Sequence, residues 1–234
     1  MKVSLKKHVQ EGHFPKMKFF VFLGAPGSGK GTQAQNLASS NANRLLHIST
    51  GQLIRDEINC GTDLGRQLKE KTNTGGLVSD IDIFNVLAKK LAAVSDKEIV
   101  ILDGFPRTLN QAELLKEFAE KTGNTIENVV YFSIADAALV DRLAGRFTCG
   151  HCGAVYHNHH NAPKVSGVCD FCGSHDFHIR PDDTKEVVEK RLSVFHAETE
   201  PLVSYYEALG VLFKLDASQS VESIKETLLK NISL

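Results

Sequence analysis

The sequence predicts an α/β protein built on a doubly wound parallel sheet, and three observations support this prediction. Apolar runs typical of buried parallel strands alternate with segments of helical pattern. The first run, "KFFVFLG" (18–24), leads directly into the glycine-rich stretch "GAPGSGKGTQA" (24–34) and then into a helical segment. A hydrophobic content of 42% and a charged content of 24% are ordinary for a globular domain with a real core.

The expected elements follow one another in a regular order. Buried strands are expected at 18–24, 44–50, 98–104, 128–134 and 211–218. The run "EIVILDG" (98–104) ends in an acid and is typical of a central parallel strand. Helices are expected at 31–40, 51–76 (in two pieces split near Gly61), 80–94, 109–123, 136–146, 182–210 and 220–232. In such a sheet, ligands bind at the carboxyl ends of the strands.

The expected organisation is one core with two inserted lobes. Residues 1–16 are basic and lack the apolar region of a secretory signal, so we expect a disordered extension before a core at 17–234. The lobes are expected at 49–78 and 141–183, where the composition becomes more polar or rich in cysteine. No apolar run approaches the length of a membrane span, and a net charge of −1 does not favour nucleic acid or anionic membranes. We therefore expect a cytoplasmic protein.

The glycine-rich stretch predicts a phosphate-binding loop. Between a strand and a helix, such a loop wraps backbone N–H groups around a phosphate, and its glycines permit unusual dihedral angles and close approach. The helix N-terminus adds partial positive charge, Lys30 adds a full charge, and Thr32 is expected on the metal side of the phosphates. The general pattern has Ser or Thr directly after the lysine, whereas here Gly31 intervenes.

Six sequence blocks resemble the adenylate kinase family. They are "GAPGSGKGTQA", "HISTGQLIRDE", "GGLVSD", "DGFPRTLNQA", "DRLAGR" and "RPDDTKEVVEKRL", and they occur in the family's order. The resemblance covers residues 18 to about 216, and the GKGT variant of the loop is the form this family carries. It implies a P-loop core, an AMP-binding lobe at 49–78, a lid at 141–183 and the reaction MgATP + AMP ⇌ 2 ADP.

Charged side chains at motif positions are the expected catalytic groups. Phosphoryl transfer depends on charge neutralisation and alignment, and the planar guanidinium of arginine suits phosphate oxygens. Asp103 ends a predicted strand and is expected to hold magnesium-bound water, although a helix cap or loop carboxylate is the alternative. The family usually has an acid where this chain has Gln52, which affects an outer metal contact. The predicted catalytic set is Lys30, Asp103, Arg107, Arg142, Arg180 and Arg191.

The resemblance implies two nucleotide sites. The implied ATP site contains the loop together with residues that cover or flank the donor: Gly24, Ala25, Pro26, Gly27, Ser28, Gly29, Lys30, Gly31, Thr32, Arg142, Arg146, Val155, Tyr156 and Gln219. The implied AMP site comprises Thr50, Arg55, Gly76, Leu77, Val78, Gly104, Phe105, Pro106, Arg107, Gln111, Arg180 and Arg191. Gln111 carries both a donor and an acceptor and can read an adenine edge. A kinase for another monophosphate remains the alternative, although Thr50, Thr108 and Gln111 favour AMP.

Four cysteines predict a structural metal site. Cys149-x2-Cys152 and Cys169-x2-Cys172 are separated by sixteen residues, a spacing that suits tetrahedral Zn²⁺, although four thiolates also suit iron. Free thiols or two disulfides are the alternatives. The module is too small and too poor in apolar residues to fold by burial alone, so the metal would supply its stability.

The cysteine module also raises a different class of function, because zinc ribbons occur in nucleic-acid binders. Residues 147–178 carry one lysine and no arginine, so their affinity for a phosphate backbone would be poor. The neighbouring histidines at 151, 157, 159 and 160 are expected to be exposed and surplus to the metal. The fifth cysteine, Cys60, is expected to be an ordinary buried or half-buried residue.

Overall fold

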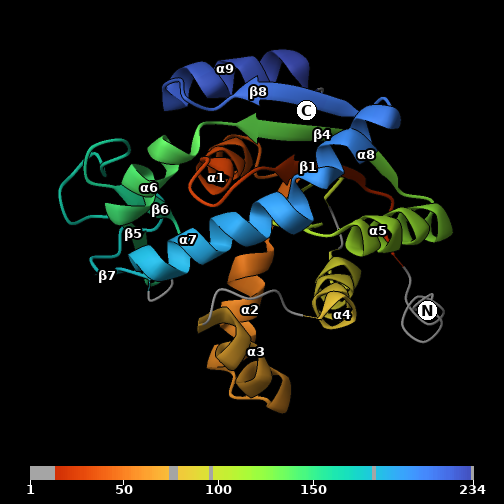
Figure 1. Ribbon diagram of the computed structural model, residues 1–234, viewed down its shortest axis with the longest axis horizontal. Coiled ribbons are helices and arrows are strands. Elements are labelled where there is room, and N and C mark those ends of the chain that lie inside the picture. The colour runs from red at the N-terminus through yellow and green to blue at the C-terminus, as the bar shows by residue number, and fades with distance from the viewer. Residues whose placement is uncertain (1–13, 74–78, 95–96, 181–182, 233–234) are drawn as a thin grey trace.

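A five-stranded parallel sheet forms the centre of the computed structural model, which describes residues 14–73, 79–94, 97–180 and 183–232 (Figure 1). The strand order is β2-β3-β1-β4-β8, and every neighbouring pair is parallel. This confirms the predicted doubly wound fold. The strands are β1 (Lys18–Leu23), β2 (Leu45–Ser49), β3 (Ile99–Asp103), β4 (Thr125–Ser133) and β8 (Leu212–Asp216).

Alternate residues of β1 pack on opposite faces of the sheet, because successive side chains of a strand point to opposite sides. Phe20 and Phe22 face helices α1 (Lys30–Ser40) and α9 (Val221–Asn231). Phe19, Val21 and Leu23 face the opposite layer. That layer is formed by α4 (Asp80–Ala92), α5 (Leu109–Thr122) and α8 (Pro201–Ala208). Burial on both faces explains why the strands are continuously apolar rather than alternating.

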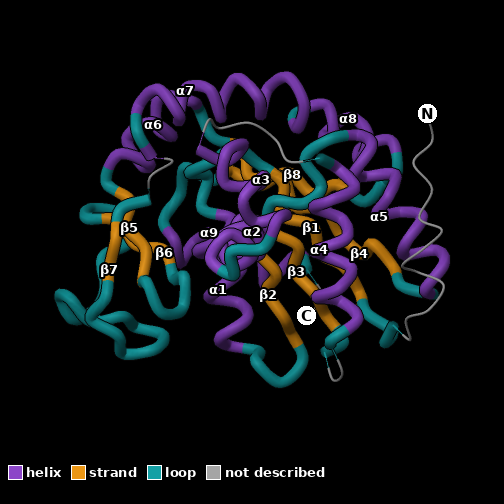
Figure 2. Tube along the Cα trace, turned by 90° about the horizontal axis from the view of Figure 1, so that it is seen from below, coloured by secondary structure: helices purple, strands orange, loops and turns teal. Residues whose placement is uncertain are grey.

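Two lobes extend from the carboxyl edge of the sheet. Helices α2 (Thr50–Asn59) and α3 (Asp63–Asn73) form the first, split at Gly61 as predicted. The second is a small antiparallel sheet of β5 (Arg146–Cys149), β6 (Val155–His157) and β7 (Phe177–His178), which Figure 2 shows apart from the main sheet. Its base is flanked by α6 (Asp136–Ala144) and α7 (Lys185–Val194).

The predicted helix at 182–210 is interrupted by a π-helical turn, η2 (Phe195–Thr199), between α7 and α8. A π-turn adds a residue to the helical repeat and so re-aims the side chains within it. Here it directs the buried Thr199 hydroxyl to the carbonyl of Arg107, at 2.8 Å. The apolar pattern predicted the helix but gave no signal for this turn.

The folded core begins before the expected boundary at Met17. Phe14 packs edge-on against Phe118 with ring centroids 4.9 Å apart, and it contacts the main core. The remainder of the predicted extension, residues 1–13, lies outside the described residues. At least part of the segment at 1–16 therefore contributes to packing.

We expect Phe118→Ala to lower the free energy of unfolding by about 3–5 kcal/mol. Phe118 is fully buried in α5, and its ring also contacts Phe19 and Phe84, so truncation leaves a cavity that the strands cannot fill. Urea unfolding measures the change. The matched control is Leu229→Ala in α9, which is 47% exposed and should cost less than about 1 kcal/mol. Equal losses in the two variants would contradict the assignment of the core.

Candidate active site

A cavity of about 1180 Å³ opens where the strands end, between the main sheet and the two lobes. The glycine loop lies on one side, the carboxyl end of β3 forms its floor, and the cysteine lobe contributes its β6 edge. Six arginines, each from a different helix, strand or loop, line it: Arg55, Arg107, Arg142, Arg146, Arg180 and Arg191. A concave site with this many cations is suited to polyphosphate.

The glycine loop needs its glycines for close approach as well as for backbone freedom. Gly27 has φ of 85°, and a Cβ there would lie 2.9 Å from Cγ of Leu143 in α6. At Gly24 a Cβ would lie 2.9 Å from the carbonyl oxygen of Phe132 in β4. The loop is therefore pressed against the sheet and α6, which fixes its backbone N–H groups at the mouth of the cavity.

The Lys30 ammonium lies inside the loop. Its Nζ donates to the carbonyl oxygens of Gly24 at 2.7 Å and Ala25 at 2.8 Å, and to Oγ of Ser28 at 3.2 Å. Burial, with the repulsion of Arg107, Arg191 and Arg146, lowers the pKa of Lys30 to about 8, although attraction to Asp103 partly opposes this shift. A bound polyphosphate would offset the desolvation and restore the charged form.

The Asp103 carboxylate faces the loop from the end of β3. Its Oδ2 lies 3.4 Å from Nε2 of His47 in β2, and a Cβ on Gly31 would lie 3.2 Å from the same oxygen. Burial alone would raise the pKa of Asp103, but the bond to His47 and the charges of His47, Lys30 and Arg107 hold it below its usual value. Ionised Asp103 and the Thr32 hydroxyl of the cavity wall are oxygen donors of the kind that Mg²⁺ prefers, so the residues fit this metal.

The side chain of Arg107 is positioned by its own loop. Its Nε donates to the carbonyl of Gly104 at 2.8 Å, and Oγ1 of the buried Thr50 donates to the same carbonyl at 2.8 Å. The backbone is held as well, because the Arg107 N–H donates to Oε1 of Gln111 at 2.7 Å and its carbonyl accepts from Thr199. The Nε contact holds the guanidinium at the cavity wall, and the other three hold the loop that carries it.

A buried carboxylate organises two further arginines. Asp183, whose side chain is 1% exposed, binds Arg146 through both oxygens, and Nη1 of Arg191 lies 3.4 Å from its Oδ1. Arg180 donates through Nε to Oγ1 of Thr148 at 2.9 Å, and Arg142 donates to the carbonyl of Ala217 at 2.9 Å. The arginines are thus anchored in a fixed array with mutual repulsion reduced by Asp183.

The cavity brings together most of the predicted site residues. Those that line it are Gly24, Pro26, Gly27, Ser28, Gly29, Lys30, Gly31, Thr32, Arg55, Asp103, Gly104, Pro106, Arg107, Arg142, Arg146, Val155, Tyr156, Arg180, Arg191 and Gln219. Ala25, Thr50, Phe105 and Gln111 are buried behind the wall. Gly76, Leu77 and Val78 lie outside the described residues.

Three residues that organise the site were not predicted. Asp183 had a signal, because "DD" stands between two motif arginines, but the sequence does not say which carboxylate faces them. His47 and Thr199 had none, since their partners Asp103 and Arg107 are distant in sequence.

Gln52, at the position where the family usually has an acid, links the two lobes. Its Oε1 accepts from Nη2 of Arg55 at 2.8 Å, and its Nε2 donates to Oδ1 of Asp56 at 2.8 Å. A Cβ on Gly153, in the first cysteine turn, would lie 2.9 Å from Oε1 of Gln52. The amide therefore positions Arg55 and contacts the cysteine lobe without adding a negative charge.

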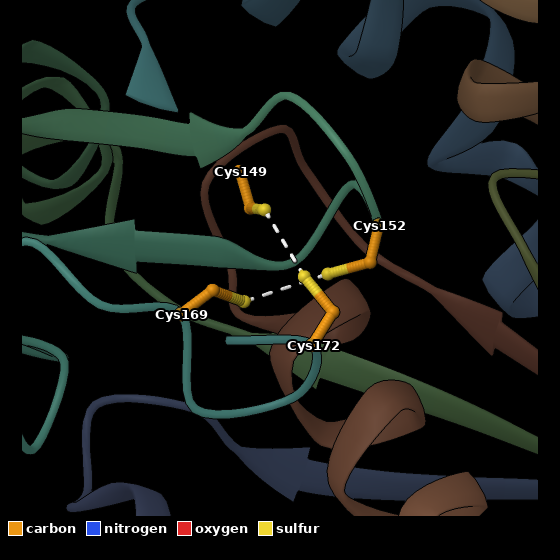
Figure 3. Close-up of side chains that lie close together, drawn as sticks. All are labelled: Cys149, Cys152, Cys169 and Cys172. Carbon is orange, nitrogen blue, oxygen red and sulfur yellow. Dashed lines mark hydrogen bonds between the residues drawn. The ribbon is translucent and has the colours of Figure 1, made fainter. Parts of the chain in front are cut away.

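The four cysteines of the second lobe converge, as Figure 3 shows. All four Sγ atoms lie within 4.8 Å of one another, with Cys149–Cys172 at 3.6 Å and Cys152–Cys169 at 3.5 Å. A tetrahedron of thiolates with metal–sulfur bonds of about 2.3 Å has edges of roughly 3.8 Å, so this arrangement fits Zn²⁺. None of the four is in a disulfide.

Two expectations about single residues are wrong. Cys60 is exposed rather than buried or half-buried, because it lies at the end of α2 on the outer side of its lobe. His157 is buried, at 6% exposure, rather than exposed in a loop. Its Nδ1 accepts the N–H groups of His159 and His160 at 3.0 and 3.2 Å, and its ring covers Gly145, so it anchors the base of the lobe.

These features define the class of protein: a P-loop phosphotransferase with two lobes over a cation-lined cavity. Comparisons with known proteins narrow the class. The family model "Adenylate kinase" matches residues 22–211. Proteins named adenylate kinase include one from Rhizobium rhizogenes, 40% identical over 87% of this chain and 94% of its own length. Another, from Limosilactobacillus reuteri, is 40% identical over 90% of this chain and 96% of its own length. A third, from Caldicellulosiruptor bescii, is 38% identical over 92% of this chain and 98% of its own length.

The chain belongs to the adenylate kinase family of nucleoside monophosphate kinases. This membership confirms the predicted family, fold and phosphotransferase class, and the family implies binding of ATP, AMP and ADP. Within the described ranges, no helix combines the length and apolar character needed to cross a membrane.

We expect affinity for ATP without magnesium to fall about tenfold between pH 7 and pH 9. Below pH 8 the free protein already carries the Lys30 proton, whereas above pH 8 binding must first take up a proton. Titration calorimetry in two buffers of different ionisation enthalpy measures both the affinity and the proton uptake. Lys30→Met should bind weakly with no such pH dependence, and a flat profile for the unaltered protein would contradict the lowered pKa.

Proposed function

We propose that the protein catalyses reversible phosphoryl transfer from MgATP to AMP, giving two ADP. The observation that carries this proposal is the cavity itself, in which one loop ammonium and an array of arginines surround a space at the strand ends. Its volume exceeds the roughly 300–1,000 Å³ of a pocket for one small ligand. Two nucleotides meeting phosphate to phosphate fit this size and charge.

The donor nucleotide is assigned to the glycine loop. Residues 24–32 would bind the polyphosphate through backbone N–H groups and Lys30, while Arg142 and Gln219 flank the adenosine. Asp103, through water, and Thr32 would hold Mg²⁺, which would supply positive charge to neutralise the charge that develops on the phosphates. Support for this arrangement comes from the lowered pKa of Asp103, which keeps the carboxylate ionised beside the loop.

The acceptor is assigned to the side of α2 and the β3–α5 loop. Arg55 and Arg107 would bind the AMP phosphate and Gly104 would lie along the nucleoside, while Gln111, buried behind the wall, would meet the base. The resemblance also implies residues 76–78 in this site, and these lie outside the described residues. Arg180 and Arg191 would then lie between the AMP phosphate and the terminal phosphate of ATP. There a phosphate oxygen of AMP attacks the terminal phosphorus, the bond from that phosphorus to the β-phosphate oxygen breaks, and the β-phosphate leaves as part of ADP. The protein's part is to align the two groups and to stabilise the charge on the transferred group.

The cysteine lobe is assigned the role of a lid. Val155 and Tyr156 of β6 would cover the donor nucleotide, and closure would exclude water that otherwise hydrolyses ATP. The Tyr156 hydroxyl accepts from the N–H of Asp170 at 2.7 Å and donates to Cys169. The Tyr156 ring stacks on Phe147, so the side chain is held within the lobe. Tyr156 therefore lines the cavity through the edge of β6 and not through a side chain that is free to move.

The lid metal is proposed to be structural Zn²⁺, held by Cys149, Cys152, Cys169 and Cys172. The apolar cluster of the lid contains only four fully buried residues, of which two are cysteines, so burial alone supplies little stability. The Tyr156 hydroxyl donates to Sγ of Cys169 at 3.4 Å, a contact that favours the thiolate form that binds metal. We also propose a cytoplasmic monomer, since these thiols are unpaired and one chain builds the whole cavity.

A coupled assay with MgATP and AMP, CMP, UMP or GMP tests the function. We expect ADP formation with AMP to be the fastest, and Arg107→Ala to lower kcat/KM for AMP by at least about 100-fold through lost alignment. The matched control is Arg44→Ala, which removes an exposed arginine paired with Glu98 and should leave the rate unchanged. No turnover with AMP, or a preference for CMP, would overturn the proposal.

The lid metal has its own test. Elemental analysis of protein purified without chelators should find one zinc per chain, and Cys152→Ser should lose it and lower the melting temperature by at least about 5 °C. Cys60→Ser is the control, since Cys60 is exposed and outside the cluster. An equal effect of the two substitutions, or iron in place of zinc, would contradict the assignment.

A further inference from the structure

A hydrogen-bonded cluster joins the first turns of α4 and α5 behind the cavity wall. Asp80 opens α4, and its Oδ1 accepts from Oγ1 of Thr108 at 3.1 Å and from Nε2 of Gln111 at 2.8 Å. Its Oδ2 accepts from Nδ2 of Asn110 at 2.7 Å. One carboxylate thus binds three side chains of the neighbouring helix start, two residues after the segment implied in AMP binding.

This cluster fixes the orientation of the Gln111 amide. The Arg107 N–H can only donate, so it requires the amide oxygen, which it reaches at 2.7 Å. The Asp80 carboxylate can only accept, so it requires the amide nitrogen. Gln111 is 3% exposed, and a reversed amide would leave two mismatched pairs with little access to water.

The fixed amide has one hydrogen left to donate. Nε2 carries two hydrogens, and Asp80 takes one; among the described residues, Gln111 makes no further side-chain hydrogen bond. A 6-aminopurine such as adenine presents an acceptor at N1, whereas the 6-oxopurines hypoxanthine and guanine present an N1–H donor. A donor facing a donor in a water-poor site is strongly unfavourable.

We propose that Asp80 is a specificity-determining residue that acts through Gln111: it holds the amide nitrogen toward the acceptor base and so selects 6-aminopurine over 6-oxopurine monophosphates. This inference rests on the proposed function, since it assumes that Gln111 meets the base of the acceptor nucleotide. Neither Asp80 nor Gln111 lines the cavity in this structure: the Gln111 amide lies one hydrogen bond behind the wall residue Arg107, so the base must reach past that wall to meet it. A purely structural role, in which Asp80 only joins α4 to α5, is the alternative that the experiment must separate.

Three single variants separate these roles. Asp80→Ala removes the oxygen that accepts from the Gln111 amide. Asp80→Asn loses the same charge but keeps Oδ1 as the acceptor for Gln111. Its Nδ2 then replaces Oδ2, and Asn110 can turn its own amide to accept from that nitrogen. Asp82→Ala removes the other first-turn carboxylate of α4 and controls for the helix dipole. We expect Asp80→Ala to raise KM for AMP about tenfold and to reduce the AMP-over-IMP ratio of kcat/KM by at least about tenfold. KM for ATP should change less than about twofold, and Asp80→Asn and Asp82→Ala should retain the selectivity.

A double variant tests the orientation directly and does not depend on how well Asp80→Ala folds. Asp80→Asn combined with Gln111→Glu keeps the net charge and reverses the direction of the hydrogen bond between the two positions. The amide introduced at position 80 donates to the carboxylate introduced at position 111, whereas in the unaltered protein Gln111 donates to Asp80. The carboxylate oxygen introduced at position 111 would then face the base and accept from the N1–H of a 6-oxopurine. We expect this variant to prefer IMP over AMP, with thermal unfolding within a few degrees of the parent protein.

Two outcomes would overturn the inference. One is an Asp80→Ala variant whose melting temperature falls while its AMP-over-IMP ratio of kcat/KM stays unchanged. That result would mean that Asp80 has only the structural role of joining α4 to α5. The other is a double variant that still prefers AMP. Failure of the proposed function is distinct from both, since it is seen in the unaltered protein as absence of ADP formation from MgATP and AMP.

Discussion

The site depends on one constraint: a lysine ammonium is held out of water at the mouth of a buried strand. Burial lowers the pKa of Lys30 to about 8, and the remaining charge is stabilised by loop carbonyls and by Asp103 across the loop. Gly31 favours the closeness of this pair, because a Cβ there would lie 3.2 Å from Oδ2 of Asp103. The glycine directly after the lysine, which departs from the general P-loop pattern, therefore relieves a tight contact between α1 and the end of β3.

Concentrating arginines around that ammonium is costly unless their repulsion is reduced. Asp183 does this from the far side of the cavity, where it is almost fully buried between Arg146 of the lid and Arg191 of α7. The same contact joins the lid to the core helix behind it. Charge compensation and the placement of the lid are therefore one structural feature, and a substitution at Asp183 would disturb both at once.

Sequence periodicity predicted the five strands of the main sheet and the helices because each buries a continuous or regularly spaced apolar face, as β1 does with Phe20 and Phe22 on one side of the sheet. It did not predict the short strands β5, β6 and β7 of the cysteine lobe. It gave no signal for the π-turn at 195–199, whose Thr199 hydroxyl donates to the carbonyl of Arg107, a residue distant in sequence. Motif spacing predicted the loop and the cysteine cluster, since both are local. The burial of His157 was missed because its partners, Gly145 and Asp141, become neighbours only when the lobe folds back on α6.

The two lobes that border the cavity are stabilised in different ways. Ile54 of α2 and Leu68 of α3 belong to the same apolar cluster as the main core, so the first lobe is stabilised by packing that it shares with the sheet. The lid has a separate cluster of Cys149, Ala154, Tyr156 and Cys169. A lobe with its own small core can move relative to the sheet without exposing the main core, but it needs another source of stability. Under the proposed function, the four converging thiols would supply that stability by holding a metal, and the segment would close over the nucleotides as a lid.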